Sequence, residues 1–390
     1  DPSLGFDNNG NLYCCYVDFS KVVDSGAVYV AKSTDGGLNW NSPVKAIDMH
    51  ADGQQKPIDR PWMAVDATNG PHAGNVYVTS MPPLTFGPIP PPYHPYFTRS
   101  TDGGGSFMPW RYLDTTGFLA GSQIPGPMPS PVVGPDGRFH ASYPSYVPSQ
   151  NLLPIGILAT SSDGGNSISH QSNFAITSGF SDTSAKRASL LRVDPSDPNH
   201  LLVVYLATPN GDADVFIRET FDGGQNWGAE QRVNDDPVGN NRMQDMVWAA
   251  FGENGDLVVT WRDRRNGNDS TYQTATEQYA AFRHRDSTNF SKNFRLSDTQ
   301  ISYDVILEEA GNDFMCVDLS EDTITAVWGD VRSGTVTIYM YRASANEGPV
   351  SSNAIVEETI PYFDYAPNPF DDQISISTKG LEKVAVFKMN

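Results

Sequence analysis

The stretch Ser33-Thr-Asp-Gly-Gly-Leu-Asn-Trp40 is the first of four copies of one short pattern. A serine or threonine leads each copy, an aspartate follows two positions later, and a Gly-Gly pair comes next. The other copies span 100–107, 161–168 and 220–227, and the four aspartates are Asp35, Asp102, Asp163 and Asp222. Because the copies recur at intervals of about 60 to 70 residues, they predict a repeat architecture with one supersecondary unit per repeat.

The residue types in this pattern are those of a tight turn. An aspartate carboxylate can accept hydrogen bonds from backbone N–H groups of its own turn, and the glycines permit positive φ. The residue that closes each copy is expected to begin the next strand and to pack between sheets. These closing residues are Trp40, Phe107, Ile168 and Trp227. We therefore interpret the four copies as structural turns and not as catalytic groups.

A second repeat lies within the first. Six segments share an apolar run, a turn containing Asp, Asn or Gly, and a second apolar run, which is typical of a β-hairpin. They are residues 4–13, 62–78, 131–140, 190–205, 249–258 and 316–325. The expected units are 1–57, 58–122, 123–182, 183–238, 239–300 and 301–350.

The pattern Ser/Thr-x-Asp-x-Gly-x-x-aromatic resembles the Asp box, or BNR repeat, of the sialidase-type β-propellers. Together with the six hairpins, this resemblance implies an all-β, six-bladed β-propeller over residues 1–350. In units one to four the box is expected to join the third and fourth strands of a blade. In units five and six we expect Trp261–Gly267 and Trp328–Gly334 to form the third element, and 266–282 to be a long connection.

Composition agrees with a β-rich chain and excludes several classes of partner. The 34 glycines, 29 prolines and 38% hydrophobic residues suit short strands with tight turns. A net charge of −20 would repel nucleic acid and anionic membrane surfaces. No apolar stretch approaches the roughly 20 residues of a transmembrane helix. Three cysteines make no disulfide framework, so Cys14, Cys15 and Cys316 are interpreted as sheet or core residues.

Metal ligation is weakly indicated. The seven histidines lack the spacing of a zinc site. Two aspartate pairs, Asp212 with Asp214 and Asp235 with Asp236, could bind Ca²⁺ through carboxylate oxygens, although turn acids have the same appearance. Ca²⁺ is thus the one cofactor that the sequence leaves open.

Charged residues just ahead of three inner strands are the candidates for a ligand site. They are Asp59 and Arg60, Lys186 and Arg187, and Arg242 with Asp245. The resemblance to sialidases implies three arginines that clamp a substrate carboxylate, and Arg60, Arg187 and Arg242 are the candidates for that role. The alternative is that these arginines brace loops between blades.

The catalytic set of the sialidases is not recognisable in the sequence. The family's Arg-Ile-Pro motif is missing, and Arg60-Pro61 is only a partial echo of it. A Tyr nucleophile with its Glu cannot be matched, although Tyr303 with Glu308 or Glu309 is conceivable. Asp263 with Arg265, and Asp330 with Arg332, are predicted structural ion pairs, while Arg264 is expected to be exposed.

The C-terminal part has a different character. After a linker at 351–364, Tyr365-Ala-Pro-Asn-Pro-Phe370 is followed by two alternating strands up to Asn390. This segment, with Pro367, Asn368, Pro369 and Phe370 at its centre, resembles the start of a type A C-terminal sorting domain of the type IX secretion system. The resemblance implies a Bacteroidota protein, exported by that machinery and secreted or held at the outer cell surface, whose sorting domain is truncated in this sequence.

Three functions remain open from the sequence. The first is a sialidase-like propeller that binds, and could hydrolyse, a glycan. The second is a non-catalytic adhesion or scaffold propeller that uses the same secretion route. The third is a lyase acting on an acidic polysaccharide. The basic residues favour the first, and the missing Arg-Ile-Pro motif favours the second.

Overall fold

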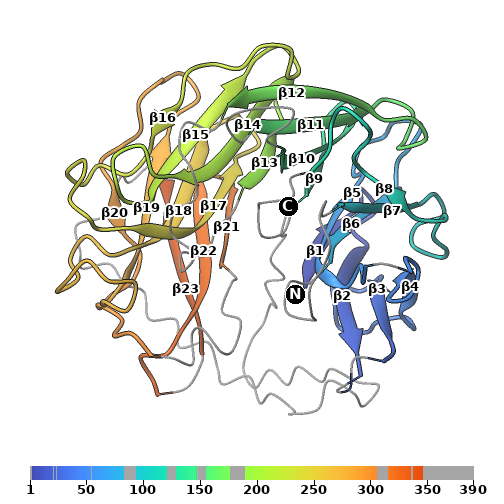
Figure 1. Ribbon diagram of the computed structural model, residues 1–390, viewed down its shortest axis with the longest axis horizontal. Helices are drawn as coiled ribbons and strands as arrows, with labels where there is room; N and C mark the ends of the chain where they lie inside the picture. Colours follow the sequence, from blue (N-terminus) through green and yellow to red (C-terminus); the bar gives the residue numbers. More distant parts are fainter. Residues whose placement is uncertain are drawn as a thin grey trace.

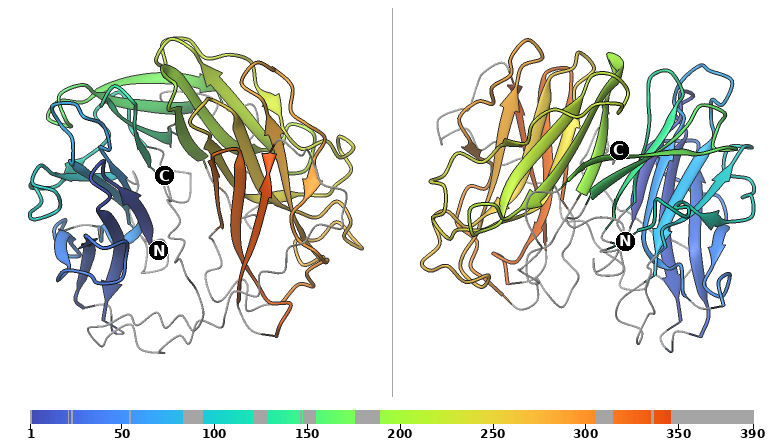
Figure 2. Two further views of the ribbon diagram at one scale, coloured as in Figure 1. Left: turned by 180° about the vertical axis from the view of Figure 1, so that it is seen from behind. Right: turned by 45° about the horizontal axis from the view of Figure 1, so that its top comes forward.

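The computed structural model describes residues 2–345 except 21, 23, 54, 83–93, 121–128, 146, 148–154, 176–188, 305–314 and 335–336. These residues form six antiparallel sheets, five of four strands and one of three. The sheets follow one another around a common centre in chain order, from β1–β4 in blue to β21–β23 in red (Figure 1). The view from behind shows the same succession (Figure 2). The all-β prediction is confirmed.

The strand bounds follow the expected repeat. The first three sheets contain β1 (Ser3–Phe6), β2 (Leu12–Phe19), β3 (Gly26–Ser33), β4 (Val44–Asp48); β5 (Asp59–Val65), β6 (Val76–Met81), β7 (Tyr96–Ser100), β8 (Arg111–Tyr112); β9 (Ser130–Val133), β10 (Phe139–Ser145), β11 (Ile155–Ser161), β12 (Ser169–Ala175). The last three contain β13 (Ser189–Asp194), β14 (Asp197–Ala207), β15 (Asp214–Thr220), β16 (Gln231–Arg232); β17 (Gln244–Phe251), β18 (Leu257–Asp263), β19 (Glu277–Arg283), β20 (Phe294–Arg295); β21 (Met315–Ser320), β22 (Thr323–Asp330), β23 (Thr337–Ser344).

The first strand of every sheet faces the centre. All six predicted hairpins are present as antiparallel pairs, for example β1 with β2 in the register Leu4 to Cys14. The six first strands line one axial cavity together, through residues such as Leu4, Met63, Val193 and Val317. The apolar core lies in layers between neighbouring sheets, where side chains of one sheet pack on the next.

The two ends of the axis differ in which connections they carry. The turns between first and second strands lie at the same end as the turns between third and fourth strands, and we name this end the Asp-box face. The connections from second to third strands, and from each sheet to the next, lie at the opposite end, which we name the loop face. Inner strands therefore start at the loop face and end at the Asp-box face.

The four repeated turns share one set of hydrogen bonds. In the first, the Ser33 hydroxyl donates to Asp35 Oδ1 at 2.8 Å and accepts the Gly37 N–H at 2.8 Å. Asp35 in turn accepts the Asn39 N–H at 2.9 Å. Equivalent bonds recur in the turns of Asp102, Asp163 and Asp222, and these bonds lower the pKa of all four carboxyl groups. Each turn joins the third and fourth strands, as predicted.

Two expectations about these turns need correction. Trp40 does not begin the outer strand, since β4 starts at Val44; the closing residue packs on the core from the turn, as Trp227 does. The fifth sheet also has a turn at this position, between β19 and β20, in which Phe290 packs on the core. Arg285 replaces the aspartate there, and this substitution hides the turn in the sequence.

The middle of units five and six also differs from the expectation. Trp261 and Asp263 belong to β18, the second strand of the sheet, and not to its third element. The third strand is β19, which overlaps the end of the segment expected to be a long connection and pairs with β18 over its whole length. In unit six, Trp328 and Asp330 likewise belong to the second strand, β22, and the third strand is β23, which begins after the expected segment.

Cys14, Cys15 and Cys316 are free thiols in sheets, and burial raises the pKa of each. Within the described ranges no helix is long and apolar enough to cross a membrane. Most of the proline-rich segment 86–95 and the whole sorting-domain segment 365–390 lie outside the described residues.

Candidate functional site on the loop face

Inner strands β5 and β17 begin with the same local distortion. Each has a register shift beside its first residues, between Asp59 and Trp62 in β5 and between Asp245 and Trp248 in β17. Each distortion contains a non-glycine residue with positive φ, Arg60 at 45° and Met246 at 50°. Bulges re-aim side chains, and strained backbone of this kind clusters at functional sites.

The two bulges aim a pair of tryptophans at each other. The rings of Trp62 and Trp248 stack with centroids 5.4 Å apart, although the two strands belong to the second and fifth sheets. This contact spans the axis and brings the starts of β5 and β17 to one place on the loop face. The sequence carries a signal for it that was missed, because Asp-x-x-Trp occurs at Asp59–Trp62 and again at Asp245–Trp248.

Asp245 is the centre of a buried ion cluster at the start of β17. Its carboxylate accepts a bidentate pair of hydrogen bonds from Arg262, at 2.7 and 2.6 Å, and a bond from Arg264 Nη1 at 3.0 Å. All three side chains are buried. Burial alone would raise the pKa of Asp245, but the charges of Arg262 and Arg264 hold it far below its ordinary value. The expectation that Arg264 is exposed is therefore wrong.

Two tyrosines cover this cluster. Arg262 donates to the Tyr272 hydroxyl at 2.9 Å, and the Arg264 guanidinium lies 4.4 Å from the centre of the Tyr272 ring. Tyr303 packs edge-on against Tyr272 with ring centroids 6.4 Å apart. The cluster thus places two phenols and two guanidinium groups together beside the bulge of β17.

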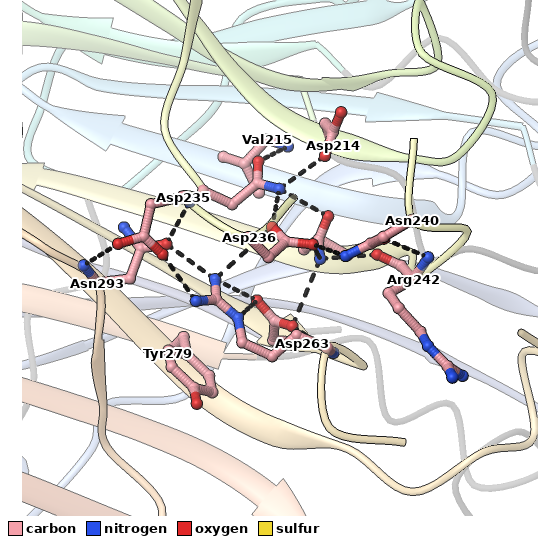
Figure 3. A network of polar contacts seen from close by, with 12 residues as sticks. Asp214, Val215, Asp235, Asp236, Asn240, Arg242, Asp263, Tyr279 and Asn293 are labelled. Atoms are coloured by element: carbon pink, nitrogen blue, oxygen red, sulfur yellow. Dashed lines mark hydrogen bonds and ion pairs between the residues drawn. The ribbon is translucent and has the colours of Figure 1, made fainter. Parts of the chain in front are cut away.

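A second polar network holds the connection between β16 and β17 (Figure 3). The Asn234 side chain donates to Asp214 at 2.6 Å and Asp236 at 2.7 Å, and Asn240 donates to Asp236 at 2.7 Å. The Arg242 N–H donates to Asp212 Oδ2 at 2.8 Å. The network fixes the backbone of this connection as far as β17.

The Arg242 side chain leaves this network. In Figure 3 it extends away from the dashed contacts, while the backbone of Arg242 stays within them. Its Nη1 atom is buried and has no hydrogen-bond partner among the described residues. Asp269 feels the charge of Arg242, but its carboxylate accepts hydrogen bonds from Thr271. Hydrogen bonds therefore hold the backbone of Arg242, while its side-chain Nη1 is a donor without a partner among the described residues.

The other predicted site residues are placed as follows. Asp59 and Arg60 are the first two residues of β5 and lie at the loop face. Asp245 is buried and forms ion pairs with Arg262 and Arg264. Arg187, Glu308 and Glu309 lie outside the described residues, so the three-arginine clamp and the Tyr–Glu pair remain predictions. The Asp263–Arg265 and Asp330–Arg332 ion pairs are present at 2.9 and 2.6 Å.

The aspartates considered for calcium have other partners. Asp214 pairs with Arg232 at 2.7 Å, and Asp235 pairs with Arg265 at 2.7 Å. Burial raises the pKa of Asp212 and of Asp236. In the part of the chain that the structure describes, no group of three or more His, Cys, Asp or Glu side chains could hold a metal ion.

No protein-family profile and no curated protein matches this chain. Solved structures do match it. The Hadza microbial sialidase Hz136 is similar over 89% of this chain with a TM-score of 0.51 and 14% identity, and the chain spans 65% of that protein's length. A protein of unknown function from Dyadobacter fermentans is similar over 87% of this chain and 93% of its own length, with a TM-score of 0.54 and 14% identity.

A polysaccharide lyase, an ulvan lyase, matches 88% of this chain and 80% of its own length at a TM-score of 0.54 and 11% identity. At such identities the likeness shows the fold alone. The chain thus has a β-propeller fold similar to that of sialidases and of other glycan-active enzymes.

Proposed function

We propose that residues 1–350 form a six-bladed propeller that binds an acidic glycan on the loop face, with Arg242 as the group that holds the sugar's carboxylate. The observation that carries the proposal is the buried Nη1 atom of Arg242, which has no partner among the described residues. Structural neighbours that are named for glycan cleavage support the same ligand class, since they include sialidases and a lyase whose structure contains a glucuronate saccharide.

Electrostatics make the choice of Arg242 specific. The chain carries a net charge of −20, so an anionic ligand is repelled by the surface as a whole and needs a local cation. The neighbouring arginines Arg262 and Arg264 are occupied by Asp245. A guanidinium matches a carboxylate through two parallel hydrogen bonds, and a half-buried one is screened less by solvent than a surface lysine.

Hydrolysis is the enzymatic form of this proposal. Tyr303 and Tyr272 are the phenols closest to the arginine cluster, and a sialidase-like reaction uses a tyrosine nucleophile. Elimination by a lyase is the second candidate, which the likeness to the ulvan lyase favours. A propeller that binds without cleaving is the third.

One set of assays separates these forms. Binding and turnover are measured with sialyllactose, with ulvan and with a neutral glycan as control. A hydrolase releases free sialic acid, a lyase forms an unsaturated product that absorbs in the ultraviolet, and an adhesion module binds without product. Failure to bind any acidic glycan contradicts the proposal.

Variants of Arg242 then test its role in binding the acidic glycan. Arg242→Ala should weaken acidic-glycan binding by about ten- to a hundredfold, and Arg242→Lys should restore only part of it because a single ammonium cannot form the bidentate pair. Arg285→Ala, which removes an exposed arginine on the Asp-box face, is the matched control and should bind normally. Equal losses in Arg242→Ala and Arg285→Ala would show a general charge effect instead.

We propose further that the protein is carried to the outer cell surface by the type IX machinery through residues 365–390. The sequence Pro367-Asn-Pro-Phe370 supports this route. In a host that has this machinery, the protein joined to a complete sorting domain should reach the cell surface, and the same protein without 365–390 should stay inside the outer membrane, as fractionation would show. Normal export of the deletion variant would contradict the proposed route.

A further inference from the structure

A second candidate site lies at the other end of the axis. The axial cavity has a volume of about 320 Å³ and is lined by inner strands and by the turns that follow them at the Asp-box face. The lining is mainly apolar and includes Leu4, Val133 and Leu319. On β17 it begins at Trp248, beyond the bulge, so the cavity is separate from the arginine cluster of the loop face.

One cation lines this apolar cavity. Arg192, on β13, is 3% exposed and belongs to the cavity wall. Its Nε donates to the Ala249 carbonyl at 2.7 Å and its Nη1 donates to the Leu191 carbonyl at 2.8 Å. The guanidinium lies 5.0 Å from the centre of the Trp248 ring. Two backbone carbonyls and one ring thus hold the group in a fixed orientation.

Arg192 has no acidic partner among the described residues. Its Nη2 atom is buried and makes no hydrogen bond there. The other buried arginines of the described residues each form an ion pair with a carboxylate. Arg262 and Arg264 share Asp245, and Arg283 pairs with Glu219. Burial lowers the pKa of Arg192 to about 10, which leaves it charged at neutral pH.

An uncompensated buried charge is costly, and proteins ordinarily pair it. Two acids, Glu253 and Asp318, also line the cavity, but neither forms an ion pair with Arg192. Glu253 lies beyond the end of β17, toward the Asp-box face, and is exposed. Among the described residues that line the cavity, Arg192 is the buried charged side chain without an oppositely charged partner.

We propose that this cavity binds a small aliphatic carboxylate, with its charged end at the Arg192 guanidinium and its chain along Leu4, Val133 and Leu319. A carboxylate supplies the missing acceptor and the missing charge. An apolar chain of a few carbons fits the wall that surrounds the guanidinium. The proposal rests on Arg192 and not on Arg242, so it is tested separately from the glycan proposal, although Trp248 contributes to both ends of the axis.

The test uses sodium butyrate as the probe and the intact protein. Thermal unfolding and calorimetry are followed while butyrate is titrated against butyramide, its neutral analogue, and against sodium chloride at equal ionic strength. Butyrate should raise the melting temperature with saturation, since a ligand that binds only the folded state stabilises it. An equal response to butyramide or to chloride would overturn the assignment of a carboxylate site.

Two variants locate the binding. Arg192→Met keeps length and apolar character, and should weaken butyrate binding by about tenfold or more. Ala67→Trp places a large ring at an exposed position of the cavity lining, so it should reduce binding even if Arg192→Met fails to fold. Arg285→Met is the control and should respond to butyrate normally. Unchanged binding in Ala67→Trp, or in folded Arg192→Met, would contradict the site.

Discussion

The two faces of the propeller are built from opposite kinds of sequence. On the Asp-box face, four turns repeat the same hydrogen bonds around Asp35, Asp102, Asp163 and Asp222. On the loop face, the connection ahead of β17 has its own network, and among the described inner strands β5 alone begins with the same bulge as β17. The repeated sequence therefore forms turns that maintain the fold, whereas the candidate site is built from residues that do not belong to the repeat.

The difference also appears in how charges are satisfied. An Asp-box carboxylate is exposed and satisfied by its own turn, within four residues. Asp245 on the loop face is buried and depends on Arg262 and Arg264, seventeen and nineteen residues away. Local bonds give turns that withstand substitution, whereas a shared buried cluster makes three residues depend on one another.

The largest effect is expected at Asp245. Asp245→Asn keeps the shape but leaves two buried guanidinium groups without a counter-charge, and should destabilise the protein by about 3–5 kcal/mol. Urea unfolding measures this free energy. The equivalent Asp35→Asn on the Asp-box face should cost clearly less, because water can solvate its exposed turn. Equal losses would break the contrast between the faces.

A smaller effect is expected from two glycines with positive φ in the repeated turns, Gly224 at the second position of its Gly-Gly pair and Gly36 at the first position of its pair. In Gly224→Ala the new methyl would lie 2.4 Å from Leu158 Cδ2, so strain and a clash with the neighbouring sheet should together cost about 2–4 kcal/mol. Gly36→Ala meets no atom within 4 Å and should cost only the backbone strain, about 1 kcal/mol. Similar free energies of unfolding for the two variants would show that the turns do not pack between blades.

The next effect is a dependence of stability on pH near the Asp-box face. His200 on β14 lies 2.9 Å from Asp194 and 2.8 Å from Glu219, which is close to the end of β15. Burial alone would lower the pKa of His200, but these carboxylates raise it above its usual value, and Arg283 with His200 holds the pKa of Glu219 at about 2 against its own burial.

The sign of the pH dependence follows from those directions. Stability from the protonated His200 is full below about pH 6.5 and is lost as pH rises through the raised pKa, whereas stability from Glu219 is lost as pH falls toward 2. His200→Gln should therefore lower the melting temperature most between about pH 4.5 and 6.5, and less in alkaline solution. A loss that is independent of pH would contradict the ionic account.

The smallest effect on stability is expected at Arg242. Its buried Nη1 atom makes no hydrogen bond among the described residues, so Arg242→Ala should change the free energy of unfolding by no more than about 0.5 kcal/mol. The same urea experiment checks this value. A loss above about 2 kcal/mol would mean that Arg242 braces the loops, the alternative that its sequence position leaves open.

The fold could be predicted because its signal is local and repeated. Ser33, Asp35 and Gly37 lie within five positions, and the bonds that they make in the structure are the ones that such a turn requires. The turn of Arg285 escaped notice because one substitution removed the aspartate from the pattern. Without the pattern, the sequence predicts a connection where β19 lies.

The site could be predicted only in part, because its partners are distant and depend on a bulge. Arg242 and Asp245 were found from their position ahead of an inner strand. The burial of Arg264 could not be foreseen, because alternation along a strand fails where β18 ends and a loop folds back over it. Arg192 resembles any strand residue in sequence, and the absence of an acidic partner for it among the described residues is visible only in three dimensions.

A crystal structure of the protein with the acidic glycan that binds best tests the central claim most directly. The account predicts the sugar on the loop face, with a carboxylate oxygen about 3 Å from the Arg242 guanidinium. A sugar bound on the Asp-box face, or on the loop face without contact to Arg242, would contradict it.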